Sequence, residues 1–221
     1  MSDRWATFDC YGTLVDWENG IGSELGRLFG AEEAPRLLVR YHELERMIQS
    51  ERPAATYREV LTAGVELLTR EEATVLPAEE MDALARSLPD WPVFPDVRRG
   101  LEAARRRGWR LAILSNTDRD LIDSTIAAIG VPFELAIVAG EIGSYKPAHR
   151  HWEVFRDETG ADEARHVHVA QSIYHDIAPA TELGLQSIWV DRQGEPPDPR
   201  PARTLFDLTG LAAALDELVP A

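Results

Sequence analysis

The chain has 221 residues, which is enough for one large domain or for a core domain that carries a smaller insertion. Hydrophobic residues make up 44% of the chain, which predicts a packed core and argues against wholesale disorder. The formal net charge of −15 argues against broad binding to nucleic acid or to an anionic membrane, so an anionic substrate would need local Arg and Lys side chains.

The cysteine content and the lack of targeting signals indicate a compartment. Cys10 has no second cysteine to pair with, so no disulfide can form within the chain, which fits a reducing cytosol. The first residues lead directly into an apolar run without the anatomy of a signal peptide. No apolar run approaches the length that spans a bilayer. We therefore expect a cytoplasmic protein with no membrane and no nucleic-acid partner.

The first apolar run, Trp5–Phe8, ends in a carboxylate. Asp9 follows it directly, and Gly12 lies in the turn that comes next. Open α/β sheets bind ligands at the carboxyl ends of their parallel strands, so Asp9 stands where a reactive group is useful. A structural role in the turn is the alternative, because aspartates are frequent at such junctions. Tyr11, two residues after Asp9, is not ionised near neutral pH.

Residues 16–90 contain four helical patterns and no convincing strand. The patterns cover Ile21–Phe29, Pro35–Gln49, Tyr57–Leu68 and Glu79–Leu88. We predict that this segment is an all-helical cap domain above the carboxyl ends of the sheet, inserted into a core domain of residues 1–15 and 91–221. A helical lid in that place could close over Asp9 and exclude water.

After residue 90 the chain alternates between apolar runs and amphipathic helical patterns. The runs are typical of buried parallel strands and cover Leu111–Leu114, Leu135–Val138, Val167–Ala170 and Ser187–Val190. The helical patterns cover Val97–Arg107, Arg119–Ile129, His149–Thr159 and Ile177–Leu183. Gly194–Pro201 is typical of a surface loop, and Arg203–Leu218 of a short edge element with a closing helix. The alternation predicts an α/β fold with a doubly wound parallel sheet.

Four short segments resemble the motifs of the haloacid dehalogenase superfamily, in the same order along the chain. Phe8–Leu14 resembles motif I, Leu114–Asn116 motif II, Lys146–Pro147 motif III and Val169–Asp176 a modified motif IV. The resemblance covers essentially the whole chain and implies a Rossmann-like core with a helical cap after the first strand. The 2-haloacid dehalogenase branch is the best match, because it has an aromatic residue at the position of Tyr11.

The resemblance implies a catalytic group built on a carboxylate nucleophile. Asp9 would form an ester with the substrate, and hydrolysis of that ester would free it again. Lys146 would pair with Asp9 and Asp176 and keep both ionised. Asp176 would orient or deprotonate the attacking water, and a helix N-cap is its structural alternative. Thr13 would hydrogen-bond near the nucleophile, and Ser172 would help to orient Asp9 or Lys146.

A second set of residues is expected to bind the substrate. By resemblance, Ser115 and Asn116 would hold the substrate carboxylate and the halide. Arg40 is followed four residues later by Leu-Glu, as in the cap of the dehalogenase branch, and would reach down to the substrate or the leaving halide. The backbone N–H groups of Cys10 and Tyr11 could form an anion-binding nest beside Asp9.

Two positions favour dehalogenation over phosphate hydrolysis. Phosphatases of the superfamily use an aspartate at the position of Tyr11 to protonate the leaving alcohol, whereas a halide leaves without a proton. They also place an aspartate at the position of Gln171 to bind Mg²⁺, for which a neutral glutamine is a poorer ligand. We therefore predict no required metal and no cofactor. Trp152 departs from the dehalogenase pattern, which has a tyrosine there.

These features predict a hydrolase that converts a short 2-haloalkanoic acid into the 2-hydroxy acid and halide through an ester of Asp9. A Mg²⁺-dependent small-molecule phosphatase of the same superfamily is one alternative, and a non-catalytic ligand-binding member is another. We expect a small anionic substrate as the partner, and the resemblance suggests a homodimer.

Overall fold

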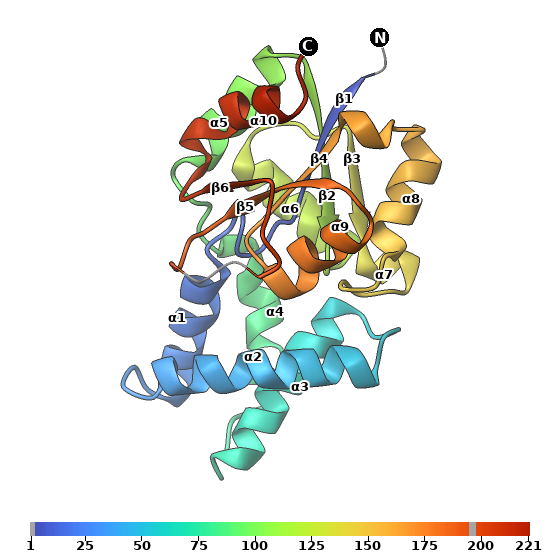
Figure 1. Cartoon of the computed structure of the whole chain (residues 1–221). Helices are drawn as coiled ribbons and strands as arrows, with labels where there is room; N and C mark the ends of the chain where they lie inside the picture. Colours follow the sequence, from blue (N-terminus) through green and yellow to red (C-terminus); the bar gives the residue numbers. More distant parts are fainter. Residues whose placement is uncertain (1–2, 195–197) are drawn as a thin grey trace.

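The computed structural model describes residues 3–194 and 198–221, and these residues contain one six-stranded parallel sheet (Figure 1). The strand order is β3-β2-β1-β4-β5-β6. The strands are β1 (Arg4–Phe8), β2 (Trp109–Ser115), β3 (Leu135–Val138), β4 (His166–Ala170), β5 (Gln186–Val190) and β6 (Arg203–Leu205). Because the order reverses between β1 and β4, the carboxyl ends of these two strands form the crevice where open α/β sheets bind ligands.

Helices cover both faces of this sheet, as a doubly wound fold requires (Figure 1). One face carries Ala6 and Phe8 and packs against α5 (Val97–Arg106), α6 (Arg119–Ile129) and α10 (Leu211–Leu218). Trp5 lies on the opposite face with α8 (Arg150–Thr159), while α9 (Ala178–Glu182) packs beside β5. The short helix α7 (Ala139–Ile142) follows β3. Burial on both faces explains why all five residues of β1 are buried.

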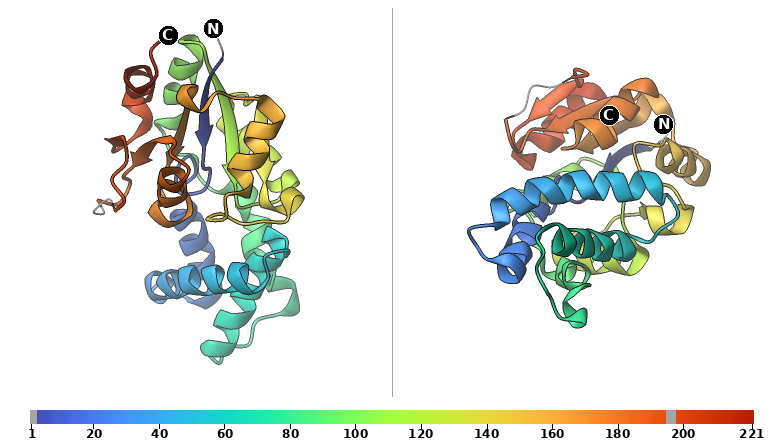
Figure 2. Two further views of the ribbon diagram at one scale, coloured as in Figure 1. Left: turned by 45° about the vertical axis from the view of Figure 1, so that its right-hand side comes forward. Right: turned by 90° about the horizontal axis from the view of Figure 1, so that it is seen from below.

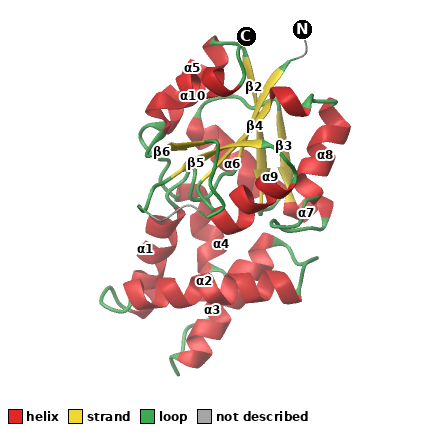
Figure 3. Ribbon diagram, in the orientation of Figure 1, coloured by secondary structure: helices red, strands yellow, loops and turns green. Residues whose placement is uncertain are grey.

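The segment between β1 and α5 is helical and lies beyond the carboxyl ends of the strands (Figure 3). It consists of α1 (Trp17–Phe29), α2 (Ala34–Glu51), α3 (Tyr57–Glu71), α4 (Ala83–Ser87) and the 3₁₀ turns Ala78–Glu80 and Leu88–Asp90. We call these elements the helical layer. Helices α2 and α3 lie side by side across the end of the sheet (Figure 2). No helix in the described part of the chain is long and apolar enough to cross a membrane.

Polar contacts join the helical layer to the sheet. The carboxylate of Asp118, which precedes α6, accepts the first free N–H groups of α3, from Tyr57 at 2.9 Å and from Arg58 at 3.0 Å. The hydroxyl of Tyr145 donates to the carbonyl oxygen of Ala55 at 2.8 Å. A carboxylate is favoured at a helix N-terminus because it satisfies unpaired N–H groups and complements the helix dipole. These contacts set the position of α2 and α3 above the crevice.

The predicted α/β fold is confirmed, and all five predicted strands are present, together with the short edge strand β6. The single helix predicted over Glu79–Leu88 is wrong, because a 3₁₀ turn, the five-residue α4 and a second 3₁₀ turn replace it. The interruption lies at Met81 and Asp82, and Pro89, which lacks an N–H, prevents α4 from extending further. Residues 195–197 of the predicted surface loop lie outside the described residues. The division into two domains stays a prediction.

The close packing of α3 against α2 depends on a glycine. A Cβ placed on Gly64 of α3 would lie 2.5 Å from Cε2 of Tyr41 in α2, a ring that is fully buried. We predict that Gly64→Ala lowers the free energy of unfolding by about 1–3 kcal/mol, because neither helix can give way without moving the core. Urea unfolding followed by circular dichroism measures this change.

Gly22 of α1 provides the matched control. Its Cβ would meet only Cδ2 of Leu38 at 3.8 Å, which is an ordinary contact. Gly22→Ala should therefore raise the free energy of unfolding by about 0.5–1 kcal/mol, the usual gain in a helix interior. Equal effects of the two substitutions would contradict the packing described for Gly64.

Candidate active site

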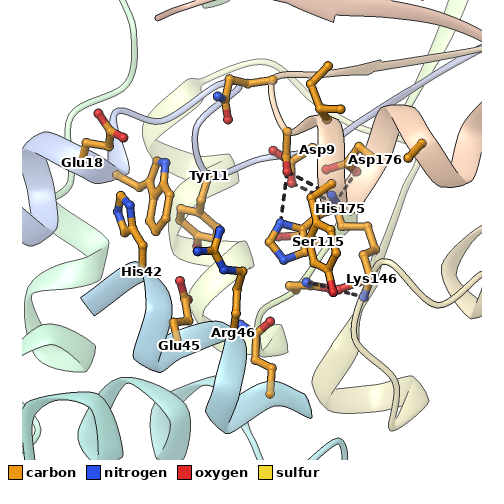
Figure 4. Close-up of a pocket in the computed structure, with 18 of the residues that line it drawn as sticks. Asp9, Tyr11, Glu18, His42, Glu45, Arg46, Ser115, Lys146, His175 and Asp176 are labelled. Carbon is orange, nitrogen blue, oxygen red and sulfur yellow. Dashed lines mark hydrogen bonds and ion pairs between the residues drawn. The ribbon is translucent and has the colours of Figure 1, made fainter. Parts of the chain in front are cut away.

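An ammonium group between two carboxylates forms the centre of the site (Figure 4). The Nζ of Lys146 donates to Oδ1 of Asp9 at 2.9 Å, to Oδ1 of Asp176 at 2.7 Å and to the carbonyl oxygen of Leu114 at 2.8 Å. The lysine side chain is 1% exposed. Three donors are therefore used on three acceptors, which fixes the ammonium in one place.

Asp9 is positioned by the turn that follows β1. The hydroxyl of Thr13 donates to Oδ2 of Asp9 at 2.7 Å and accepts the backbone N–H of Gln171 at 2.9 Å, so it ties the β1 turn to the loop after β4. Gly12 has a φ of +99°, and a Cβ on it would come within 3.0 Å of the Trp17 side chain. Only glycine suits this conformation and this space.

Lys146 is positioned by a side-chain amide. Asn116, directly after β2, donates through Nδ2 to the carbonyl oxygen of Lys146 at 3.0 Å and accepts its backbone N–H at 2.7 Å. Asn116 is predicted to bind the substrate, and these two bonds give it a further role in holding the lysine loop. It also lines the cavity, so one amide hydrogen stays available.

The charges of this cluster are strongly coupled. Burial raises the pKa of Asp9, against the opposing effect of the Lys146 ammonium. For Asp176 burial acts in the same direction, but the ammonium and the hydrogen bond from His168 outweigh it and lower the pKa below its ordinary value. The pKa of Lys146 is raised although burial opposes this, because both carboxylates favour the charged form. We infer an ionised Asp176 and a charged Lys146 at neutral pH.

Asp176 lies in a short π-helical turn, Ile173–Ile177, that leads into α9. Ser172 caps this turn, because its Oγ accepts the N–H of His175 at 3.0 Å and lies 3.1 Å from His175 Nδ1. The prediction was that Ser172 helps to orient Asp9 or Lys146, and its described hydrogen bonds go to His175. Oδ2 of Asp176 has no hydrogen-bond partner among the described residues, so it can accept one from a bound molecule.

The cluster opens into a cavity of about 490 Å³ between the sheet and the helical layer (Figure 4). Asp9, Ser115 and Tyr11 form part of its wall. The Oγ of Ser115 is buried and has no partner within the described ranges. The hydroxyl of Tyr11 lies 3.0 Å from Oγ1 of Thr125, and burial raises the pKa of this phenol well above its ordinary value. Ser115 is therefore free to bind a ligand, whereas Tyr11 is a wall residue and a poor acid.

Comparison with known proteins decides the family. The model of the haloacid dehalogenase-like hydrolases matches residues 4–184. The chain belongs to this family. The superfamily that the four motifs predict is therefore confirmed.

Named relatives of this haloacid dehalogenase-like hydrolase include both phosphatases and dehalogenases. A phosphoserine phosphatase of Thermus thermophilus is 31% identical over 123 residues, which are 55% of this chain and 49%, about half, of that protein. The (S)-2-haloacid dehalogenase 4A of Burkholderia cepacia is 25% identical over 203 residues, or 88% of this chain and 86% of that one. The structure of L-2-haloacid dehalogenase from Xanthobacter autotrophicus with chloropropionic acid covalently bound has a TM-score of 0.84 at 15% identity, and covers 99% of this chain and 100% of that chain.

The prediction for Arg40 is wrong. In this haloacid dehalogenase-like hydrolase its guanidinium pairs with Glu71 at 2.7 Å and with Glu43 at 2.6 Å, away from the cavity, and the side chain is 40% exposed. Arg46 lines the cavity instead. The two arginines are six positions apart on α2, which is about 240° around a helix, so they cannot share one face.

A polar face of α2 was not predicted from the sequence. His42, Glu45, Arg46 and Gln49 line the cavity, and their spacing of three and four residues is that of one helix face. Arg46 forms no ion pair within residues 3–194 and 198–221 and lines the cavity beside Glu45, whose carboxyl it influences electrostatically. The ring of His42 stacks on that of Trp17 with centroids 4.6 Å apart. The buried apolar positions Leu37 and Leu44 mark the face of α2 that packs in the core, but they do not tell which polar flank meets the cavity.

The other unpredicted groups are buried titratable side chains. Burial lowers the pKa of His42 and of His175 to about 4, so both are neutral at pH 7. Burial raises the pKa of Glu45 to about 7, although the Tyr57 hydroxyl donates to its Oε1 at 2.9 Å. Cys10 is fully buried and does not line the cavity, so its thiol takes no part in the site.

Glu45 predicts a pH dependence of stability. Its pKa rises on folding from 4.5 to about 7, so the folded protein loses stability as pH increases through this range. Glu45→Gln removes the titration. The free energy of unfolding of the variant minus that of the wild type should therefore be roughly 3 kcal/mol larger above pH 7 than at pH 4. Urea unfolding at pH 4, 6 and 8 measures the difference.

The control for this experiment is Glu51→Gln, which removes an exposed carboxylate from the same helix. It should leave the pH dependence of the wild type unchanged. A Glu45→Gln variant whose stability follows that of the wild type at every pH would contradict a raised pKa for Glu45.

Proposed function

We propose that the chain is a 2-haloacid dehalogenase, a hydrolase that converts a short 2-haloalkanoic acid into the 2-hydroxy acid and halide. The observation that carries this proposal is a cavity-lining carboxylate, Asp9, held by Lys146 and Thr13 beside a second ionised carboxylate. The relatives named (S)-2-haloacid dehalogenase support it, as does the similar fold of an enzyme with chloropropionic acid covalently bound.

In the first step, a carboxylate oxygen of Asp9 attacks the carbon that bears the halogen. The new carbon–oxygen bond forms as the carbon–halogen bond breaks, and the halide leaves with the bonding electrons. Lys146 and Thr13 bind different oxygens of Asp9, so they hold the carboxylate in one orientation for attack. Attack opposite to the halide inverts the configuration at that carbon.

In the second step, water attacks the ester carbonyl carbon of Asp9. Asp176 accepts a proton from this water through Oδ2, the oxygen that has no partner in the described part of the chain. The Lys146 ammonium stabilises the negative charge that develops on the ester oxygen. The bond from the Asp9 carbonyl carbon to the substrate oxygen then breaks. One proton of the water ends on the 2-hydroxy acid, and the other is released.

The substrate carboxylate binds to Arg46 in this proposal. Arg46 supplies the cation that faces the cavity, and Ser115 Oγ supplies a buried group that can donate a hydrogen bond. The backbone N–H groups of Cys10 and Tyr11 bond to no other described residue, which supports a small anion-binding nest beside Asp9. A local binding site of this kind is needed because the net charge of −15 repels anions.

A phosphatase is the second candidate, because one relative that is 31% identical over part of the chain is a phosphoserine phosphatase. Burial makes the Tyr11 phenol a poor donor of a proton to a leaving alcohol. Gln171 offers Mg²⁺ a neutral amide where those phosphatases place a carboxylate. The donor set therefore favours halide release without a required metal, and no cofactor is part of the proposal.

Domain division, location and assembly complete the proposal. We propose a core domain of residues 1–15 and 91–221 with a cap domain of residues 16–90, which contains the helical layer. A buried, unpaired Cys10 is in keeping with the cytoplasm. A homodimer is suggested by the resemblance to the dehalogenase branch.

The proposed function predicts halide release in EDTA from chloroacetate, bromoacetate, fluoroacetate or one enantiomer of 2-chloropropionate. Asp9→Asn should lower this release by roughly a thousandfold or more, because the nucleophile is lost. Halide electrodes or ion chromatography measure it. Hydrolysis of p-nitrophenyl phosphate with Mg²⁺, without halide release in any condition, would favour the phosphatase. No turnover at all, with a thermal shift on ligand addition, would favour a binding protein.

A further prediction distinguishes the roles of Arg40 and Arg46 of α2 in substrate binding. Arg46→Ala should raise KM for a 2-haloacid by roughly 10- to 100-fold, because a hydrogen bond to a charged group is lost. Arg40→Ala removes only surface ion pairs and should change KM less than twofold. Steady-state halide release gives both values. A larger effect of Arg40→Ala would contradict the geometry of α2.

A further inference from the structure

Three buried polar side chains lie behind the site, on the face of the sheet that α8 covers. Thr7 pairs with His168 across β1 and β4, and His166 lies two residues earlier on β4. All three side chains are at most 3% exposed. Burying polar side chains inside a central sheet is costly unless they are hydrogen-bonded, so hydrogen-bond partners are expected for all three.

These side chains form one continuous chain of hydrogen bonds that ends on Asp176. Nε2 of His166 lies 2.7 Å from Oγ1 of Thr7, which lies 2.9 Å from Nδ1 of His168. Nε2 of His168 lies 3.0 Å from Oδ1 of Asp176. Burial lowers the pKa of His166 to about 3, so this ring is neutral.

The direction of the last bond follows from the charge of its acceptor. Oδ1 of Asp176 already accepts a hydrogen bond from the Lys146 ammonium, and an ionised carboxylate cannot donate. Nε2 of His168 therefore carries a hydrogen and donates it. The imidazole ring is held from the other side by Trp152, whose ring meets it edge to face with centroids 5.2 Å apart.

Two donors on one oxygen fix the whole carboxylate. Lys146 and His168 both bind Oδ1 of Asp176, so rotation of the group would break both bonds. Oδ2 is left without a partner among the residues that the structure describes, and Asp176 lines the cavity. One oxygen of Asp176 is thus buried and unpaired at the wall of the cavity, where it can accept a hydrogen bond from a water that enters the site.

We propose that His168, held by Thr7 and Trp152, is a positioning residue for the hydrolysis of the Asp9 ester. It keeps Oδ2 of Asp176 aimed at the attacking water and does not touch the substrate. This inference rests on the proposed function. It also gives Trp152, which departs from the dehalogenase pattern, a role behind the site, since it is 4% exposed and does not line the cavity.

The kinetic test compares Thr7→Val with Thr7→Ser. Valine keeps the shape of threonine and removes the hydroxyl that holds His168, whereas serine keeps the hydroxyl. In Thr7→Val we expect a burst of one halide per site at the wild-type rate, followed by release of the 2-hydroxy acid that is roughly 10- to 100-fold slower. Thr7→Ser should restore most of the rate. His149→Gln, a change at a surface histidine, should leave both steps unchanged.

If Thr7 and His168 only supported the fold, Thr7→Val would slow the halide burst and the hydrolysis of the ester together, or would slow neither. Equal slowing of the halide burst and of hydroxy-acid release in Thr7→Val would therefore overturn the proposal, and so would a hydrolysis step at the wild-type rate. Thermal unfolding of each variant is measured beside the kinetics, so that a loss of folded protein is corrected for.

Nuclear magnetic resonance of the ¹⁵N-labelled histidines tests the same bond without catalysis. We expect a hydrogen-bonded, slowly exchanging proton on Nε2 of His168, assigned by its loss in His168→Gln and shifted in Thr7→Val. An unprotonated Nε2 would overturn the proposal even in an active enzyme. If the wild type releases no halide, the proposed function fails, while this resonance still decides whether His168 holds Asp176.

Discussion

The ammonium of Lys146 between two buried carboxylates is the interaction on which the rest of the site depends. Taking two carboxylates out of water is costly, and a single lysine compensates them only because further donors complete the hydrogen bonding. Thr13 donates to Asp9, and His168 donates to Asp176. The lysine also binds Leu114 at the end of β2. One charge therefore joins the ends of β1 and β2 to the π-helical turn after β4, where the strand order reverses.

The helical layer adds a second cation to the cavity, because the Lys146 ammonium is already used by Asp9 and Asp176. The chain is acidic, and the two surface arginines of α2 are neutralised by neighbouring glutamates. Arg46 points the other way and is not paired in this manner within the described ranges. Glu45 lies beside it with a pKa raised to about 7 by burial, so its own charge is weakened near neutral pH. The wall above Asp9 can thus attract a small carboxylate in a protein that otherwise repels one.

The alternation of apolar runs and helical patterns predicted the fold, and the resemblance to four superfamily motifs predicted the central cluster. Asp9, Lys146 and Asp176 occur in motifs that follow strands, and parallel strands bring such positions to one edge. Arg40 was wrong because four-residue spacing to Leu-Glu does not determine which face of a helix meets the cavity. Arg40 and Arg46 both lie outside the buried apolar stripe of α2, so only the packing of this helix above the crevice brings Arg46 to the cavity. His166 and His168 could not be found from sequence, because a polar residue inside an apolar run gives no sign of its partner across the sheet.

The role of Asp9 as a covalent nucleophile is tested most directly by the oxygen isotope that its carboxylate acquires during turnover. A single turnover in H₂¹⁸O, with enzyme in excess over a 2-haloacid that releases halide, should place one ¹⁸O in the Asp9 carboxylate. Mass spectrometry of the peptide that contains Asp9 detects it, and the 2-hydroxy acid should remain unlabelled. Label in the 2-hydroxy acid with none in Asp9 would mean that water attacks the substrate directly, which would contradict the account.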